Sequence, residues 1–383
     1  MEHQTRRFAT DATTLGNRAM NRFVQLTTLL LLSAVSGWAL PKTCNGPLPT
    51  NAPCAYYPAA IAWTGIGAAI ERYVDIYIPS GLPSTNIPVV VYLHPTLTGA
   101  PKRGQADSCF SSGAFVSAAN KDKFIAICPS STYDGAKWVW NAIALAGLFS
   151  SVPDDSGFIN YVICLVSAPT SGGGACSNSG GPAGYGFAVN TNLIGVIGGS
   201  SGGFMANRFG IDFPNVPSMI GNASGMIWAQ TPGTGNPTPP GPKFSVIELH
   251  SDNDPLVKFC GGTIAAWGQI GGALPNIPSA GTTLSPVEGD IPFWINSTSN
   301  NCNASRYSAL CTAVNGAPIP DPFFCGVAGK FITEYDDPAC NSTPGLEVKF
   351  IRVCNSTQHG FAIANSISTM IQFFFAHPKL GGH

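Results

Sequence analysis

The chain has 383 residues, of which 44% are hydrophobic and only 10% are charged, well below the roughly 25% charge of an ordinary soluble domain. This composition argues against intrinsic disorder. The 19 basic and 20 acidic residues give a net charge of −1, which leaves no basic field to hold nucleic acid.

The first predicted element is a secretory signal peptide over residues 1–39. Arg18 and Arg22 lead into an apolar run over 23–35, and small residues follow. This is the charged, apolar, small-residue order of a signal, in which Met20 is an alternative start. The run is shorter than the roughly 20 residues of a membrane span, so a retained anchor is the less favoured alternative. We expect a secreted, extracellular protein without a stable membrane anchor.

The cysteines fit an oxidising compartment. All twelve follow residue 39, and an even count there predicts up to six disulfides. No Cys-x-x-Cys pair or Cys/His cluster occurs, so we expect no metal site. Five short sequons predict a glycoprotein, with chance occurrence in an Asn- and Ser-rich sequence as the alternative. Their acceptors are Asn222, Asn296, Asn303, Asn341 and Asn355.

Apolar, β-branched runs alternate with helical patterns along the mature chain. The expected strands are 73–78, 89–93, 124–127, 193–197, 244–249 and 348–353. The expected helices are 113–120, 158–166, 202–209 and one near 361–375. Continuous apolarity indicates strands buried on both faces of a mostly parallel sheet, and helices between them indicate a three-layer α/β domain. In such domains the chemistry gathers at the carboxyl ends of the strands.

Two segments interrupt this alternation. Residues 167–188 are rich in Gly and Ser, and residues 261–345 are rich in Pro, Asn and Cys, with weak periodicity. We predict a single catalytic domain over 40–383, in which 261–345 is a disulfide-rich insertion that covers one end of the sheet.

A nucleophile motif lies between an expected strand and an expected helix. The segment 196–205 contains G-x-S-x-G, which in this setting places a serine on a sharp strand-to-helix turn. Two registers fit, with Ser200 or Ser201 as the nucleophile, and a glycine-rich turn without chemistry is the alternative. The backbone N–H of Ser201 and the helix N-terminus would face a developing oxyanion.

A serine hydroxyl needs a base to become a nucleophile. In α/β domains that carry this motif, a carboxylic acid and then a histidine follow the serine along the chain. Asp252 and Asp254 follow one expected strand, and His359 follows the last one. His94 and His250 directly terminate strands, where we expect them to hold loop backbone by hydrogen bonds. The order Ser, Asp, His therefore indicates a catalytic triad.

A second oxyanion donor is expected in the loop after the strand at 89–93. The backbone N–H of Thr96 is the candidate, because Pro95 has no N–H to donate.

Five blocks of sequence carry a resemblance. They are VVYLHPTLT at 90–98, KWVWNA at 137–142, PDDSGFINYVI at 153–163, GGSSGGFMAN at 198–207 and LHSDNDPLV at 249–257. Together they resemble the secreted polyhydroxybutyrate depolymerase and feruloyl/acetylxylan esterase group of the α/β-hydrolases, over about residues 55–260 and 346–380. The resemblance aligns the nucleophile on Ser200 and the acid on Asp254, and His359 matches by position. Pro95 and Ser251 stand where the family has glycine.

The sequence thus predicts an α/β-hydrolase fold and a secreted serine carboxylic-ester hydrolase that needs no cofactor. The resemblance implies a substrate acyl group such as 3-hydroxybutyrate oligomer, ferulate or acetate on polysaccharide. We expect a monomer whose partner is an ester substrate, polymeric or not. The alternatives are a serine peptidase of the prolyl-oligopeptidase type and a non-catalytic hydrolase-like recognition protein. Three tryptophans are candidate substrate contacts, although large aromatic residues more often belong to the core: Trp138, Trp140 and Trp228.

Overall fold

The computed structural model describes the chain in separate stretches. They are residues 42–43, 54–56, 59–63, 70–98, 113–133, 137–142, 154–167, 186–227, 244–259, 262–263, 283–284, 290–295, 331–337, 346–363 and 365–379. The chain divides into two units, Met1–Leu40 and Pro41–His383, and every described residue lies in the second. The predicted signal peptide lies outside the described residues. None of the described helices combines the length and the apolarity that a bilayer span requires.

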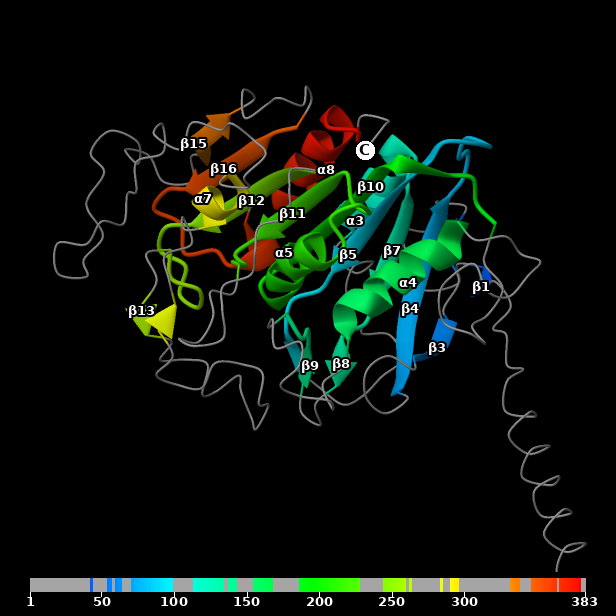
Figure 1. Cartoon of the computed structure of the whole chain (residues 1–383), viewed down its shortest axis with the longest axis horizontal. Helices are drawn as coiled ribbons and strands as arrows, with labels where there is room; N and C mark the ends of the chain where they lie inside the picture. Colours follow the sequence, from blue (N-terminus) through cyan, green and yellow to red (C-terminus); the bar gives the residue numbers. More distant parts are fainter. Residues whose placement is uncertain are drawn as a thin grey trace, which may run out of the picture. The chain divides into compact units, whose positions relative to one another are not determined.

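A large sheet runs through the second unit (Figure 1). Its order is β1 (Lys42–Thr43), β2 (Cys54–Tyr56), β4 (Ile70–Pro79), β7 (Ile125–Pro129), β5 (Ile87–Leu93), β10 (Val189–Gly199), β11 (Met219–Ala223), β12 (Ser245–Ser251), β16 (Val348–Val353) and β15 (Phe331–Asp337), and β3 (Ala59–Trp63) pairs with β4. The strands from β7 to β16 pair in parallel, whereas β4 and β15 pair antiparallel with them. The predicted mostly parallel sheet is confirmed.

Helices cover both faces of this sheet, because its central strands are apolar on both sides. In β5, Val89, Val91 and Leu93 pack in one core with α4 (Asp155–Ser167) and α5 (Ser201–Asp212). Val90 and Tyr92 of the same strand pack in a second core with α3 (Ala114–Asp122) and α8 (Ser366–Ala376). Successive side chains of a strand point to opposite faces, so the continuous apolar run produces the three layers expected of the predicted α/β-hydrolase fold.

The segment predicted as an insertion, 261–345, contributes to this architecture as well. β15 lies within it and extends the sheet beyond β16. The short helix α7 (Asp290–Ile295) also lies within it and places Trp294 in the core of α4 and α5. Two smaller sheets are formed by β6 (Leu97–Thr98), β9 (Lys137–Val139) and β8 (Thr132–Tyr133), and by β13 (Gly262–Thr263) and β14 (Thr283–Leu284).

The described cysteines agree with the expectation of disulfides. Cys128, Cys164 and Cys354 are each disulfide-bonded.

Candidate active site

The G-x-S-x-G motif forms a strained turn between β10 and α5. Ser200 occupies this turn with φ 53° and ψ −122°, a conformation that residues other than glycine rarely adopt. A Cβ atom at Gly198 would lie 2.0 Å from the carbonyl oxygen of Gly202, and one at Gly202 would lie 2.1 Å from that of Leu93. Only glycine fits two residues before and two residues after Ser200, which is why the chain can turn so sharply there.

Of the two possible registers, the one centred on Ser200 has this geometry. Ser201 is already the first helical residue of α5. Its N–H belongs to the first turn, where backbone N–H groups have no partner within the helix and the helix dipole adds positive potential. The Leu93 and His94 carbonyls lie against Gly202, so the loop that carries Thr96 starts beside the turn. The roles of Thr96 and Ser201 as oxyanion donors stay predictions.

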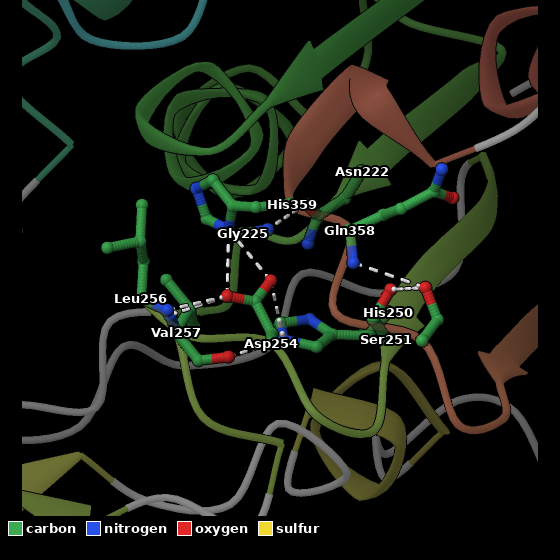
Figure 2. A network of polar contacts seen from close by, with 10 residues as sticks. Asn222, Gly225, His250, Ser251, Asp254, Leu256, Val257, Gln358 and His359 are labelled. Carbon is green, nitrogen blue, oxygen red and sulfur yellow. Dashed lines mark hydrogen bonds and ion pairs between the residues drawn. The ribbon is translucent and has the colours of Figure 1, made fainter.

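His359 and Asp254 meet through a short hydrogen bond (Figure 2). The Nδ1 atom of His359 lies 2.7 Å from Oδ2 of Asp254 and 2.9 Å from Oδ1. An ionised carboxylate only accepts, so Nδ1 carries the proton and Nε2 is the basic nitrogen of the neutral imidazole. Nε2 is buried and has no hydrogen-bond partner among the described residues.

The Asp254 carboxylate is buried and ionised. Burial alone raises the pKa of Asp254, but the hydrogen bond from His359, the nearby imidazoles and the backbone N–H of Leu256 outweigh it, so the pKa is lowered overall. The N–H groups of Leu256 and Val257 both donate to Oδ1 at 2.9 Å. The carboxylate is therefore fixed in place and charged, as the acid of a triad must be.

The histidine loop packs directly on the Ser200 turn. Gly360 begins the 3-10 helix η3 (Gly360–Ala362), and a Cβ atom built on it would lie 3.5 Å from the Ser200 nitrogen and 3.7 Å from the Ser200 Cβ. Ser200, Asp254 and His359 are thus brought to the carboxyl ends of the parallel strands β10, β12 and β16. No group of three side chains able to hold a metal ion occurs in the described part of the chain.

The two candidate acids have different partners. The Asp252 carboxylate accepts the backbone N–H groups of Asn355 at 2.9 Å and Ser356 at 3.1 Å. It also lies 3.7 Å from Nη2 of Arg352. Asp252 therefore ties the loop that leads to His359 onto the end of β12, and Asp254 contacts the imidazole itself.

His94 has the structural role that its place at a strand end predicts. The ring is buried, and Nε2 accepts the backbone N–H of Ser131 at 3.0 Å. The indole N–H of Trp140 donates to the His94 carbonyl at 2.8 Å. These contacts hold the end of β5 beside the Ser200 turn.

The burial of two tryptophans favours a place in the core for them, and their contact with substrate stays a prediction. Trp138 and Trp140 are each only 4% exposed, and Trp140 packs in the core with α4 and α5. Both side chains are interior residues that support the sheet and its loops. Trp228 lies outside the described residues.

The predicted glycosylation acceptor at Asn222 is wrong. Asn222 lies inside β11 and is 1% exposed, with Oδ1 accepting the Gly225 N–H at 2.7 Å and Nδ2 donating to Oε1 of Glu248 at 3.3 Å. An amide buried and bonded at both ends presents no acceptor nitrogen. Asn355 is exposed, and its glycosylation stays a prediction. The other three acceptors lie outside the described residues: Asn296, Asn303 and Asn341.

A buried acid pair that the sequence analysis missed lies behind the Ser200 turn. Glu248 of β12 accepts the side-chain N–H groups of Asn207 and Asn222, and Asp290 of α7 accepts the backbone N–H of Ile227 at 2.6 Å. Burial raises the pKa of Glu248 to about 7. Burial, and then the neighbouring Glu248, raise the pKa of Asp290 well above its usual value. The pair therefore holds a proton at neutral pH and joins α7 to the sheet.

Replacing Glu248 by glutamine is expected to stabilise the protein at alkaline pH. The folded-state pKa lies above the unfolded value, so the folded protein binds more protons and loses stability as the pH rises from about 4.5 through about 7. That difference corresponds to about 3 kcal/mol. Glutamine stays neutral and keeps the acceptor oxygen for both asparagines.

Thermal unfolding between pH 5 and pH 9 measures this effect. The melting temperatures of Glu248→Gln and the wild type should converge at about pH 5 and separate by roughly 5 °C at pH 8. Asp212→Asn, which removes a helix-surface acid paired with Arg208, is the control and should leave the pH slope unchanged. Identical pH slopes for Glu248→Gln and the wild type would show that the acid pair does not titrate as described.

No protein-family model and no curated protein sequence matches this chain. Among solved structures, an acetyl xylan esterase from Aspergillus awamori is similar with a TM-score of 0.44 and 16% identity, over 84% of this chain and 99% of that one. The S954A mutant of a feruloyl esterase module from Clostridium thermocellum, complexed with sinapinate, has a TM-score of 0.44 and 11% identity, over 90% and 96%. A thermostable esterase has a TM-score of 0.36 and 12% identity, over 53% of this chain and 48% of its own. At these identities and scores, the reaction has to be inferred from the site itself.

Proposed function

We propose that the protein is a secreted serine carboxylic-ester hydrolase with Ser200 as nucleophile, His359 as base and Asp254 as acid. One observation carries the proposal. The buried Asp254 carboxylate holds Nδ1 of His359 at 2.7 Å, Nε2 is left without a described partner, and the histidine loop packs on the strained Ser200 turn. A serine hydroxyl becomes a nucleophile when an imidazole in this tautomer takes its proton, and we propose that Nε2 of His359 does this for Ser200.

The reaction then proceeds in two stages. Oγ of Ser200 attacks the ester carbonyl carbon while Nε2 of His359 takes the hydroxyl proton, and the imidazolium is stabilised by Asp254. The oxyanion accepts hydrogen bonds from the backbone N–H groups of Ser201 and Thr96. The tetrahedral intermediate collapses, the proton passes from His359 to the departing alcohol, and water hydrolyses the acyl-enzyme by the same steps.

The substrate class follows from the sequence resemblance and the expected compartment. A secreted hydrolase of this group acts on hydroxyalkanoate polyester or on acyl esters of polysaccharide, such as acetate or ferulate. The proposal includes 3-hydroxybutyrate, acetate and ferulate as acyl groups, because the sequence blocks that carry the resemblance do not identify the residues that line the acyl pocket.

Turnover and covalent trapping on the mature protein test this proposal. We expect hydrolysis of p-nitrophenyl acetate and butyrate, and attachment of a fluorophosphonate probe to the peptide that contains Ser200. Cleavage of peptides but not esters would favour the peptidase alternative. Neither turnover nor labelling would favour the recognition protein. A panel of polyhydroxybutyrate, methyl ferulate and acetylated xylan then identifies the acyl group.

A further inference from the structure

A second histidine lies against the Asp254 carboxylate. His250 belongs to β12 and is 1% exposed. Its Nε2 atom lies 2.7 Å from the Val257 carbonyl oxygen and 3.7 Å from Oδ2 of Asp254 (Figure 2). A carbonyl oxygen only accepts, so Nε2 of His250 carries a proton that it donates to Val257 while facing the carboxylate.

This contact closes the turn that carries the acid. The N–H of Val257 donates to Oδ1 of Asp254, and the carbonyl of the same residue accepts from His250. One carboxylate oxygen is therefore held by backbone N–H groups, and the other lies between the imidazoles of His250 and His359. Without His250, the backbone would still hold Oδ1 and His359 would still contact Oδ2, but the Val257 carbonyl would lose its donor and Oδ2 would lose the imidazole on its other side.

The charge state of His250 suits this position. The pKa of His250 is lowered overall, mainly by burial and further by the His359 imidazole. The Asp254 carboxylate and the Val257 carbonyl raise this pKa but do not outweigh burial. The Phe259 ring packs edge-on against His250, and the Arg352 guanidinium lies over that ring, 5.2 Å from its centre. A neutral imidazole offers Asp254 an N–H dipole without a full charge that would compete with His359 for the carboxylate.

We infer that His250 is a positioning residue that fixes the orientation in which Asp254 holds His359. For its effect on turnover, the inference rests on the proposed function. It predicts a loss in the chemical step with little change in substrate binding, because the contact orients the acid and does not reach the substrate.

Kinetics of three variants test the inference. His250→Phe keeps a ring but removes the donor, and it should lower kcat by roughly 10- to 100-fold with KM within about twofold. His250→Gln has an amide N–H that can reach the Nε2 position, and it should recover most of this loss. His377→Gln is the control, because His377 bonds to Glu347 outside the site and its replacement should leave kcat unchanged.

A second readout does not depend on turnover. The Nδ1 proton of His359, shared with a carboxylate, gives a far-downfield proton resonance, which should persist in His250→Gln and broaden or vanish in His250→Phe. If His250→Phe does not fold, His250→Asn replaces it, because its shorter amide does not reach the Val257 carbonyl.

Each outcome decides the matter. The inference would be overturned if the folded His250→Phe or His250→Asn variant kept the wild-type kcat and the downfield resonance. It would also be overturned if His250→Gln lost as much kcat as His250→Phe or His250→Asn. If the wild type shows no ester turnover that depends on Ser200, the proposed function fails, and the resonance alone still decides whether His250 positions Asp254.

Discussion

Substituting Ser200 by alanine is expected to lower kcat for a p-nitrophenyl ester by about 10⁶-fold. The alanine leaves His359 no hydroxyl to deprotonate, so no acyl-enzyme can form and only the binding site and oxyanion donors still assist hydrolysis by water. KM should change little, because the side chain that is lost contributes to the transition state more than to ground-state binding. Initial rates over a range of substrate concentrations, at protein concentrations taken from absorbance, measure both constants, and the fluorophosphonate should label the wild type but not Ser200→Ala.

The adjacent serine provides the matched comparison. Ser201→Ala removes a buried hydroxyl from the first helical residue and leaves the backbone N–H in place. We expect it to cost about tenfold at most, since the predicted contribution of Ser201 comes from its backbone. A loss near 10⁶-fold in Ser201→Ala, with activity kept in Ser200→Ala, would move the nucleophile one residue along the chain.

The sheet could be predicted from sequence where burial alone decides the residues. β5 and β12 are buried along their whole length, so their apolar runs predict strands directly. β11 could not be predicted this way, because its sequence Met-Ile-Gly-Asn-Ala contains two residues that disfavour strands. It is a strand because it lies between β10 and β12, where Asn222 bonds to Glu248, and that environment exists only in the folded protein.

The candidate site divides in the same way. Motif spacing and chain order are local or sequential signals, and they led to Ser200, Asp254 and His359, which the fold brings to one edge of the sheet. Asp252 and Asp254 differ in their contacts with residues about 105 positions further along the chain, which the local sequence does not reveal. The resemblance, not the residue pattern, selected Asp254. The acid pair of Glu248 and Asp290 had no local signal beyond an acidic residue inside an apolar run.

Replacing Asp254 by asparagine is expected to lower kcat by about 10⁴-fold, by analogy with the same change in serine proteases. The amide has nearly the shape of the carboxylate, so the turn and the 2.9 Å backbone hydrogen bonds to its oxygen can persist. What is lost is the negative charge that keeps the proton on Nδ1 of His359 and stabilises the imidazolium when Ser200 attacks. The kcat of Asp254→Asn in the ester assay, with far-UV circular dichroism to establish folding, measures this loss.

Asp252→Asn is the control, because the two acids lie two residues apart at the end of the same strand. Asp252 binds the backbone of Asn355 and Ser356 and does not contact the imidazole, so its replacement weakens the attachment of the histidine loop and leaves the charge beside His359 intact. We expect a lower melting temperature and a kcat within about tenfold of the wild type, since removing hydrogen bonds to a charged group costs stability first. Only the residue that sets the imidazole tautomer can produce a 10⁴-fold effect without unfolding the site. If Asp252→Asn lost as much activity as Asp254→Asn while remaining folded, the assignment of Asp254 as the acid of the triad would therefore be wrong.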